Sequence, residues 1–379
     1  MNPRAENLAL TGIRGVAALW VALFHFCPSA AAHLGWPEIG GAITTGFLGV
    51  DLFFILSGFV LGLSYAASFE GAWRPALTRF WVGRAFRILP LHWAMLALLG
   101  VLVLLWPSQM AASDRTGANF AASFFLVHAW GVGNSMAWNW PTWSLSTEMA
   151  AYVVFPFLVL GASRIRLRRA AAILAACLCL ALFVGLLVAL DRTSLNVTGR
   201  LALVRCILEF AAGYLLSRVS WARVKQGNGE LLAAAGLLTI GVAACVTEVQ
   251  MAAPFGFALI VAACAAPSRL TKAAFANPVS VFLGRISYSG YLVHAVLLIV
   301  FEALIRTFAW SEAPFAARVG LGVAYWAALL GLSTLTRLFI EKPGQAAGAR
   351  IWVKIQASWP KKPQLDGQES VLNAPRLRD

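Results

Sequence analysis

Long apolar runs, separated by short polar stretches, dominate this chain. Ten of these runs are about 20 residues long, which is the length of helix that crosses the hydrocarbon core of a bilayer. We therefore predict an all-α fold: a polytopic membrane protein with ten transmembrane helices. The predicted spans lie at residues 8–27, 43–66, 89–106, 143–161, 170–190, 199–217, 231–247, 251–267, 280–307 and 318–340.

Two stretches depart from this pattern. Residues 119–130 are apolar but too short to cross a bilayer, and we interpret them as a re-entrant or interfacial segment; a loop lying on lipid headgroups is the alternative. From residue 342 onward the chain contains several prolines and mixed charges, which is typical of flexible segments. We therefore predict a membrane domain over residues 1–341 and a flexible cytosolic tail over residues 342–379.

Composition and charge support a membrane protein. Hydrophobic residues make up 60% of the chain and charged residues 12%, about half the charged fraction of a soluble domain. With the N-terminus in the cytosol, 21 of the 30 Lys and Arg residues lie on the cytosolic side and four on the outer side. The positive-inside rule then predicts that both termini are cytosolic. This distribution accounts for most of the net charge of +14 without a nucleic-acid partner.

The six cysteines lie in or at the edge of the predicted spans. Their spacing fits neither a metal site nor a disulfide framework, so we predict no metal and treat them as small packing residues.

Arg14 and His25 both lie within the first apolar run, which we expect to be a retained span and not a signal peptide. Ionisable groups in a bilayer core are costly and usually face a protein interior or a wet cavity. Eleven residues separate the two, so they share one helix face at a distance of roughly 16 Å. A purely structural role in helix packing is the alternative.

Two carboxylates reach a depth similar to that of His25. Asp51 and Glu148 lie within about three helical turns of the outer ends of the second and fourth spans. A carboxylate beside an imidazole can hold it in one tautomer during proton transfer, so either residue could orient His25. The alternative for Asp51 is that it pairs with a neighbouring helix.

Three arginines, Arg79, Arg84 and Arg87, precede the third span on the cytosolic side. Arg84 and Arg87 are three residues apart and share a helix face, a spacing that suits a phosphate or pyrophosphate. Anchoring at lipid headgroups is the plainer interpretation.

The other charges inside spans form two pairs, each four residues apart, and we expect both pairs to be structural. The pairs are Arg205 with Glu209 and Glu302 with Arg306.

Aromatic residues and a second histidine mark possible substrate contacts. Trp138, Trp140 and Trp143 lie near the outer mouth and could stack against a sugar ring, although interfacial tryptophan belts are common. Tyr288 and His294 lie within the ninth span, where they could line a cavity or pack in the core.

Five segments, taken together and in order, resemble the membrane acyltransferase-3 family. They cover residues 8–340 and read LTGIRGVAALWVALFHF, GFLGVDLFFILSGFVLG, RFWVGRAFRILPLHW, WSLSTEMAAYVVFP and LGRISYSGYLVH. The family includes bacterial O-acetyltransferases of O-antigen, exopolysaccharide and nodulation factors. The resemblance implies ten spans in the bacterial cytoplasmic membrane. It also implies transfer of an acyl group, usually acetyl, from cytosolic acyl-CoA to a carbohydrate hydroxyl.

The resemblance also implies roles for particular residues. The family's arginine–ten–histidine signature falls on Arg14 and His25, and its donor-binding R-x-x-R motif falls on Arg84 and Arg87. Many members carry two consecutive acidic residues where this chain has Glu148 followed by Met149, which puts a mechanism that needs both carboxylates in doubt. Longer members add an extracytoplasmic hydrolase-like domain; here we expect transfer to be completed within the membrane domain.

The sequence therefore predicts an integral membrane O-acyltransferase that uses acetyl-CoA or another acyl-CoA. His25 acts as general base towards a hydroxyl of a carbohydrate or glycolipid acceptor, and a covalent acyl-histidine is a second route. A transporter or channel for small molecules or glycans is the main alternative, because polar residues along several spans also describe a translocation path.

Overall fold

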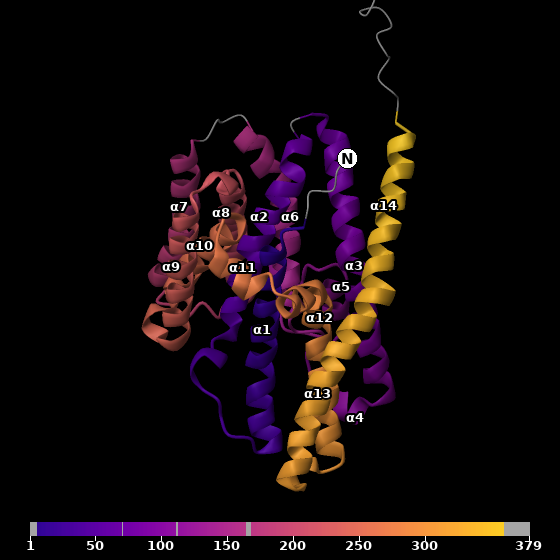
Figure 1. Ribbon diagram of the computed structural model, residues 1–379. Coiled ribbons are helices and arrows are strands. Elements are labelled where there is room, and N and C mark those ends of the chain that lie inside the picture. The colour runs from indigo at the N-terminus through magenta and orange to yellow at the C-terminus, as the bar shows by residue number, and fades with distance from the viewer. Residues whose placement is uncertain (1–5, 70, 111–112, 164–167, 360–379) are drawn as a thin grey trace, which may run out of the picture.

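The computed structural model describes residues 6–69, 71–110, 113–163 and 168–359. Within these ranges the chain is a bundle of helices with no β-strand (Figure 1). The predicted all-α class is therefore confirmed. The long helices are α1 (Leu8–Leu34), α2 (Gly49–Phe69), α3 (Trp73–Leu105), α6 (Thr142–Ser163), α7 (Arg169–Ala189), α8 (Gly199–Ser217), α9 (Gln226–Cys245), α10 (Ala253–Ala265), α12 (Pro278–Thr307), α13 (Phe315–Thr336) and α14 (Lys342–Ala357).

Nine helical segments in the described part of the chain are long and apolar enough to cross a membrane. Each overlaps a predicted span. The one remaining predicted span, residues 199–217, corresponds to α8. This helix has the required length but carries Arg200, Arg205 and Glu209. Its difference from the other nine therefore lies in charge and not in helical structure.

Helices α1 and α12 pack with their backbones almost in contact. A methyl group added at Gly15 would lie 2.3 Å from the backbone nitrogen of Gly284, and one added at Gly284 would lie 1.9 Å from the carbonyl oxygen of Thr11. Small residues permit such close approach between membrane helices. This contact brings the first and last thirds of the chain side by side and fixes the spacing of residues farther along both helices.

Glycines also allow helices α2 and α8 to pack with their backbones almost in contact. A methyl group at Gly58 would lie 1.9 Å from the carbonyl oxygen of Phe210, and one at Gly213 would lie 1.9 Å from that of Ile55. The close packing places Asp51 of α2 beside Arg205 of α8.

The predicted short segment at residues 119–130 forms helix α5 (Gly117–Phe124) and a 3₁₀ turn (His128–Trp130). The side chains of Leu126, His128 and Ala129 are fully buried. Backbone carbonyls of the segment accept hydrogen bonds from other elements, including one at Ser123 from His92 of α3 (2.8 Å) and one at Leu126 from Ser146 of α6 (2.7 Å). The segment is thus tucked into the bundle, which favours the re-entrant interpretation over a loop on headgroups.

The predicted boundary at residue 342 falls inside a continuous helical rod. Helix α13 passes through a π-helical turn (Arg337–Glu341) directly into α14, which lies along α3 (Figure 1). Pro343 follows the π-helical turn, where the regular hydrogen-bond pattern of the α-helix is already interrupted. Gly348 lies against Phe86 of α3. The prediction of a flexible tail is therefore wrong for residues 342–357, while residues 360–379 lie outside the described ranges.

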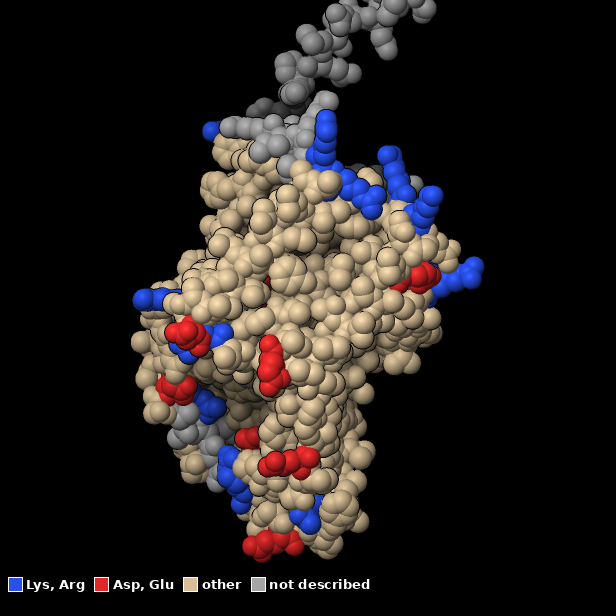
Figure 2. Space-filling model, turned by 90° about the vertical axis from the view of Figure 1, so that its left-hand side faces the viewer, with Lys and Arg blue, Asp and Glu red and all other residues tan. Residues whose placement is uncertain are grey.

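Charged residues are unevenly distributed over the surface. On the face drawn in Figure 2 uncharged residues predominate; Lys and Arg lie at the upper end and, together with Asp and Glu, in the lower part, with a broad uncharged surface between. Such a distribution suits a protein whose flanks face lipid.

Candidate active site

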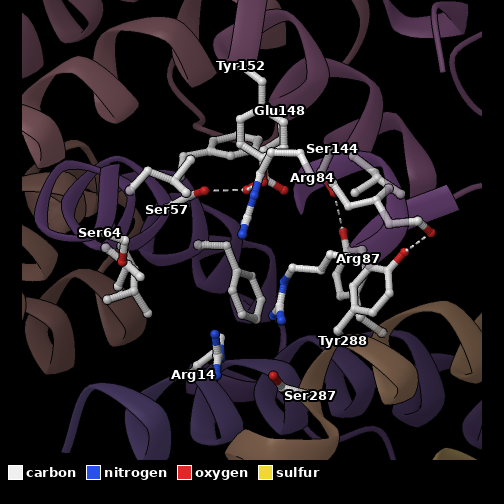
Figure 3. A pocket seen from close by; sticks show the side chains of 18 residues that line it. Arg14, Ser57, Ser64, Arg84, Arg87, Ser144, Glu148, Tyr152, Ser287 and Tyr288 are labelled. Carbon is white, nitrogen blue, oxygen red and sulfur yellow. Dashed lines mark hydrogen bonds between the residues drawn. The ribbon is translucent and has the colours of Figure 1, made fainter. Parts of the chain in front are cut away.

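An internal cavity of about 240 Å³ lies where α1, α2, α3, α6 and α12 meet. Three guanidinium groups, those of Arg14, Arg84 and Arg87, point into the same central space (Figure 3). Arg14 comes from α1 and the other two from one face of α3. The structure thus brings together the arginine of the first span and the R-x-x-R pair, which lie 70 residues apart or more in sequence.

Glu148 of α6 supplies a carboxylate in the wall of this cavity. It accepts hydrogen bonds from the hydroxyl of Ser57 and from that of Tyr152, the latter at 2.7 Å (Figure 3). Two donors from different elements fix its orientation, so Glu148 is a positioned anion facing three cations.

Arg84 is held by Tyr65 of α2. Its Nη2 lies 3.5 Å from the tyrosine hydroxyl, and its guanidinium carbon lies 5.5 Å from the ring centroid. Arg79 lies 5.9 Å from the same ring and is not among the residues that line the cavity. Of the three predicted donor-site arginines, Arg84 and Arg87 therefore line the cavity and Arg79 does not.

His25 forms a hydrogen-bonded pair with His294 of α12. Nδ1 of His25 lies 3.2 Å from Nε2 of His294, and the planes of the two rings are nearly parallel, at an angle of 17°. Nδ1 of His294 lies 3.3 Å from the carbonyl oxygen of Gly290, which can only accept. In a neutral pair, Nδ1 of His294 carries its proton, Nε2 of His294 accepts from Nδ1 of His25, and Nε2 of His25 retains its lone pair.

The two predicted carboxylate partners of His25 are bound elsewhere. Glu148 bonds to Ser57 and Tyr152, and Asp51 is fully buried against Arg205, with contacts of 2.6 Å and 2.9 Å. The interpretation that one of them orients His25 is therefore wrong in this structure. The sequence placed His25, Asp51 and Glu148 at a similar depth in the membrane. Depth alone, however, does not determine the direction in which each side chain leaves its helix.

The ion pairs predicted inside spans are present. Arg205 lies 3.7 Å from Glu209, and Arg306 lies 3.9 Å from Glu302. Asp51 joins the first pair, so one guanidinium serves two carboxylates in a buried cluster. This is the pairing role that was the alternative for Asp51.

The predicted sugar-contacting tryptophans differ in their surroundings. Trp140 lies 4.2 Å from the ring of His25 and 5.6 Å from that of His294. Trp138 and Trp143 are each only 8% exposed. Trp138 packs on Phe120, and Trp143 packs on Phe54. Only Trp140 belongs to the immediate environment of the imidazole pair.

Tyr291 and Ser144 form the boundary between the cavity and the histidine pair. Both line the cavity, and their hydroxyl oxygens lie 2.7 Å apart. The ring of Tyr291 lies 5.6 Å from that of His294, whereas His25 is not among the residues that line the cavity. Tyr288, a predicted substrate contact, lines the cavity and donates a hydrogen bond to the carbonyl oxygen of Ile88 at 2.7 Å.

Sequence reasoning did not assign roles to four of these residues: Ser57, Tyr152, Ser144 and Tyr291. Helical spacing holds a signal for two of them. Tyr152 follows Glu148 by four residues, and Tyr291 precedes His294 by three, so each shares a face with a predicted site residue. Ser57 and Ser144 meet the site only through helix packing, which the sequence does not specify.

The fold and the site thus define a helical membrane protein with a cation-lined inner cavity beside a histidine pair. The chain belongs to the acyltransferase-3 family, whose acyltransferase domain matches residues 7–336. Family membership indicates an enzyme that transfers acyl groups and does not favour the transporter alternative.

Several named proteins are similar to this chain. It is 29% identical over 328 residues to the acyltransferase MdmB of Streptomyces mycarofaciens, a match that covers 79% of this chain and 81% of MdmB. It is 31% identical over 175 residues to BcsY, a candidate membrane-bound transacylase of Komagataeibacter xylinus (44% of this chain, 41% of BcsY). It is 28% identical over 190 residues to YrhL, a candidate peptidoglycan O-acetyltransferase of Bacillus subtilis (47% and 28%). No solved structure matches.

Proposed function

We propose that this protein is an integral membrane O-acyltransferase that moves an acetyl group from acetyl-CoA to a hydroxyl of a carbohydrate or glycolipid. One observation carries the proposal: α1 presents Arg14 to a cation-lined cavity and, about 16 Å farther along, presents His25 to a hydrogen-bonding partner. The family assignment supports acyl transfer, and the similarity to a candidate peptidoglycan O-acetyltransferase supports a glycan hydroxyl as acceptor.

The donor occupies the cavity beside Arg84 and Arg87. Guanidinium groups bind phosphate oxygens through two parallel charge-assisted hydrogen bonds, which suits the anionic end of CoA. The pantetheine arm then extends past Arg14 toward Tyr291. Since Arg14 lies about 16 Å from His25 along α1, it acts on the anionic end of the donor and not on the thioester oxygen.

The chemical step takes place at His25. Nε2 of His25 removes the proton from the acceptor hydroxyl as the oxygen attacks the thioester carbonyl carbon, and the carbon–sulfur bond breaks. The proton on His25 passes to the departing CoA thiolate, which restores neutral imidazole. His294 is the positioning residue: by accepting from Nδ1 of His25 it leaves Nε2 as the basic atom. Trp140 forms one wall of the acceptor site.

The proposed topology follows the charge bias of the sequence, with both termini in the cytosol and α8 counted as the tenth span of a bacterial cytoplasmic membrane protein. The three charges of α8 do not contradict this, because Arg205 pairs with Glu209 and Asp51 inside the bundle and Arg200 lies at the end of the helix. The donor then enters from the cytosol and the acceptor from the outer side.

The decisive experiment uses purified protein in detergent with radiolabelled acetyl-CoA and a hydroxyl-bearing glycan acceptor. We expect transfer of label to the acceptor and release of free CoA thiol. A protein that leaves the thioester intact in the presence of acceptor contradicts the proposal. Mass spectrometry of surface glycans from a deletion strain identifies the acceptor through loss of one acetyl group.

A further inference from the structure

A second cavity, of about 180 Å³, adjoins the first and is lined mainly by charged side chains. We call it the basic chamber. Its five cations are Arg14, Arg87, Arg285, Arg337 and Lys342. Arg14 and Arg87 also line the inner cavity, so the two spaces share a wall made of guanidinium groups.

Two carboxylates, Glu6 and Glu341, also line the chamber, and each neutralises one cation. Glu6 lies 3.0 Å from Arg285, and the hydrogen bond from this guanidinium holds the pKa of Glu6 below its usual value. Glu341 lies 3.9 Å from Arg87 and is only 5% exposed. It accepts hydrogen bonds from Ser289 (2.9 Å) and Gln345 (3.0 Å), which fix its position.

Three cations of the chamber remain without a counter-ion. Within the described part of the chain, no carboxylate lies within 4.0 Å of Arg14, Arg337 or Lys342. Nε of Arg14 is shielded from solvent and has no hydrogen-bond partner there. Among the described residues, the chamber therefore has an excess of three positive charges and an unsatisfied donor.

A local irregularity of the backbone builds one side of the chamber. Arg337 and Glu341 are the first and last residues of the π-helical turn between α13 and α14, and both line the chamber. π-Helical turns are rare and occur frequently at functional sites. Here the turn places a free guanidinium, and Lys342 immediately after it, opposite the arginines of α1 and α3.

We propose that the basic chamber binds a phosphate-bearing ligand, namely the phosphate groups of the acyl-CoA donor. This inference rests on the proposed function and deepens it. CoA carries three phosphate groups, so the chamber adds to the contacts with Arg84 and Arg87. The donor then lies along a single line: its outermost phosphate between Arg337, Lys342 and Arg14, the other phosphates beside Arg84 and Arg87, the pantetheine arm in the inner cavity, and the thioester near His25. Lipid headgroup phosphate shares the same chemistry and is the competing source.

The test compares two pairs of charge-neutralising substitutions. Arg337→Gln with Lys342→Gln removes the two free cations that belong to the chamber alone. Arg350→Gln with Lys354→Gln, on the exposed surface of the same helix α14, is the matched control. CoA binding to the purified full-length protein in detergent is measured by equilibrium dialysis, which requires no turnover.

We expect the chamber variant to bind CoA at least about tenfold more weakly, because each charge-assisted hydrogen bond to phosphate contributes substantially to affinity, while the control binds as the wild type does. Arg337→Lys with Lys342→Arg keeps the charges and retains most of the affinity, which excludes a folding defect. S-acetyl-pantetheine is a donor that lacks the phosphates. In the chamber variant only, we expect the transfer rate with acetyl-CoA to fall relative to the rate with S-acetyl-pantetheine.

Equal CoA binding by the chamber variant and the control overturns the inference and leaves the proposed function standing. A second outcome concerns lipid: phosphatidylglycerol in nanodiscs stabilises the wild type but not the chamber variant, while CoA binding is unchanged. This outcome identifies lipid as the ligand and also overturns the donor assignment. If the proposed function itself is wrong, the wild-type protein transfers no acetyl group from acetyl-CoA or from S-acetyl-pantetheine.

Discussion

Nδ1 of His25 lies 3.2 Å from Nε2 of His294, although 269 residues separate the two in sequence. The contact exists because α1 and α12 meet at Gly15 and Gly284 with no side chain between their backbones. Positioning of the proposed base therefore depends on packing between the two ends of the membrane domain. The carboxylates that share its depth do not contribute to it.

Replacing the base tests the chemical step directly. His25→Ala is expected to lower acetyl transfer by roughly 10²- to 10⁴-fold, the range typical of a lost general base, with CoA binding retained. His33→Ala, near the end of the same helix, is the matched control and should transfer at the wild-type rate. Steady-state transfer assays and CoA dialysis provide both measurements. Wild-type transfer by His25→Ala would rule out the assignment.

The role of His294 is tested by a pair of substitutions. His294→Leu removes the acceptor for Nδ1 of His25, so kcat should fall by roughly 10²-fold while KM for the donor stays near the wild-type value. His294→Gln offers an amide oxygen in its place and should restore part of the rate. pH–rate profiles of all three proteins provide a further readout. Equal losses in both variants would indicate packing alone.

The contact between α1 and α12 is tested with glycine substitutions. Gly284→Ala places a methyl group 1.9 Å from the carbonyl oxygen of Thr11, so the helices must separate, at a cost of about 1–3 kcal/mol. We expect a lower melting temperature together with a lower transfer rate. Gly331→Ala on α13, where nothing lies within 4 Å, should change neither. A Gly284→Ala protein with wild-type stability and rate would contradict this account of the packing.

The double substitution Arg84→Ala with Arg87→Ala distinguishes donor binding from anchoring at lipid headgroups, because only donor binding affects KM for acetyl-CoA. We expect KM for acetyl-CoA to rise by roughly tenfold to a hundredfold, and more than kcat falls, because charge-assisted bonds to the donor are lost. Arg74→Ala, at the exposed start of α3, should leave KM unchanged. An effect on membrane insertion without a change in KM would support the anchoring interpretation.

The buried cluster of Asp51, Arg205 and Glu209 should act on stability and not on chemistry. Arg205→Met leaves two buried carboxylates without a cation, which is expected to lower the free energy of unfolding by about 3–5 kcal/mol. Thermal unfolding in detergent measures this change. A variant with wild-type stability would show that the cluster has another means of neutralisation.

The hydrophobic pattern predicted the helices well, because membrane spans are long and their apolar runs are uninterrupted. Each predicted span corresponds to a helix. The error lies in the predicted flexible tail, because residues 342–357 extend α13 as helix α14. Pro343 does not end the helix here, because it closely follows the π-helical turn, where the regular hydrogen-bond pattern of the α-helix is already interrupted.

The candidate site was predicted in part. Helical periodicity alone placed Arg14 and His25 on one face, and the structure places Arg14 in the wall of the cavity and His25 beside His294. The partner of His25 was not predicted, because contacts between helices depend on rotation about each helix axis as well as on depth. Arg337 and Lys342 were missed for a related reason: only the π-helical turn directs them into the chamber.

A single helix, α1, carries both Arg14 and the proposed base His25, and the helix backbone is continuous between them. The register of this rod therefore matters more than the identity of most residues along it. Inserting a single alanine between positions 14 and 25 would turn the imidazole by about 100° relative to the guanidinium and move it about 1.5 Å along the axis. The reactive group and the anchor would then face different helices, although every side chain now present in α1 was retained.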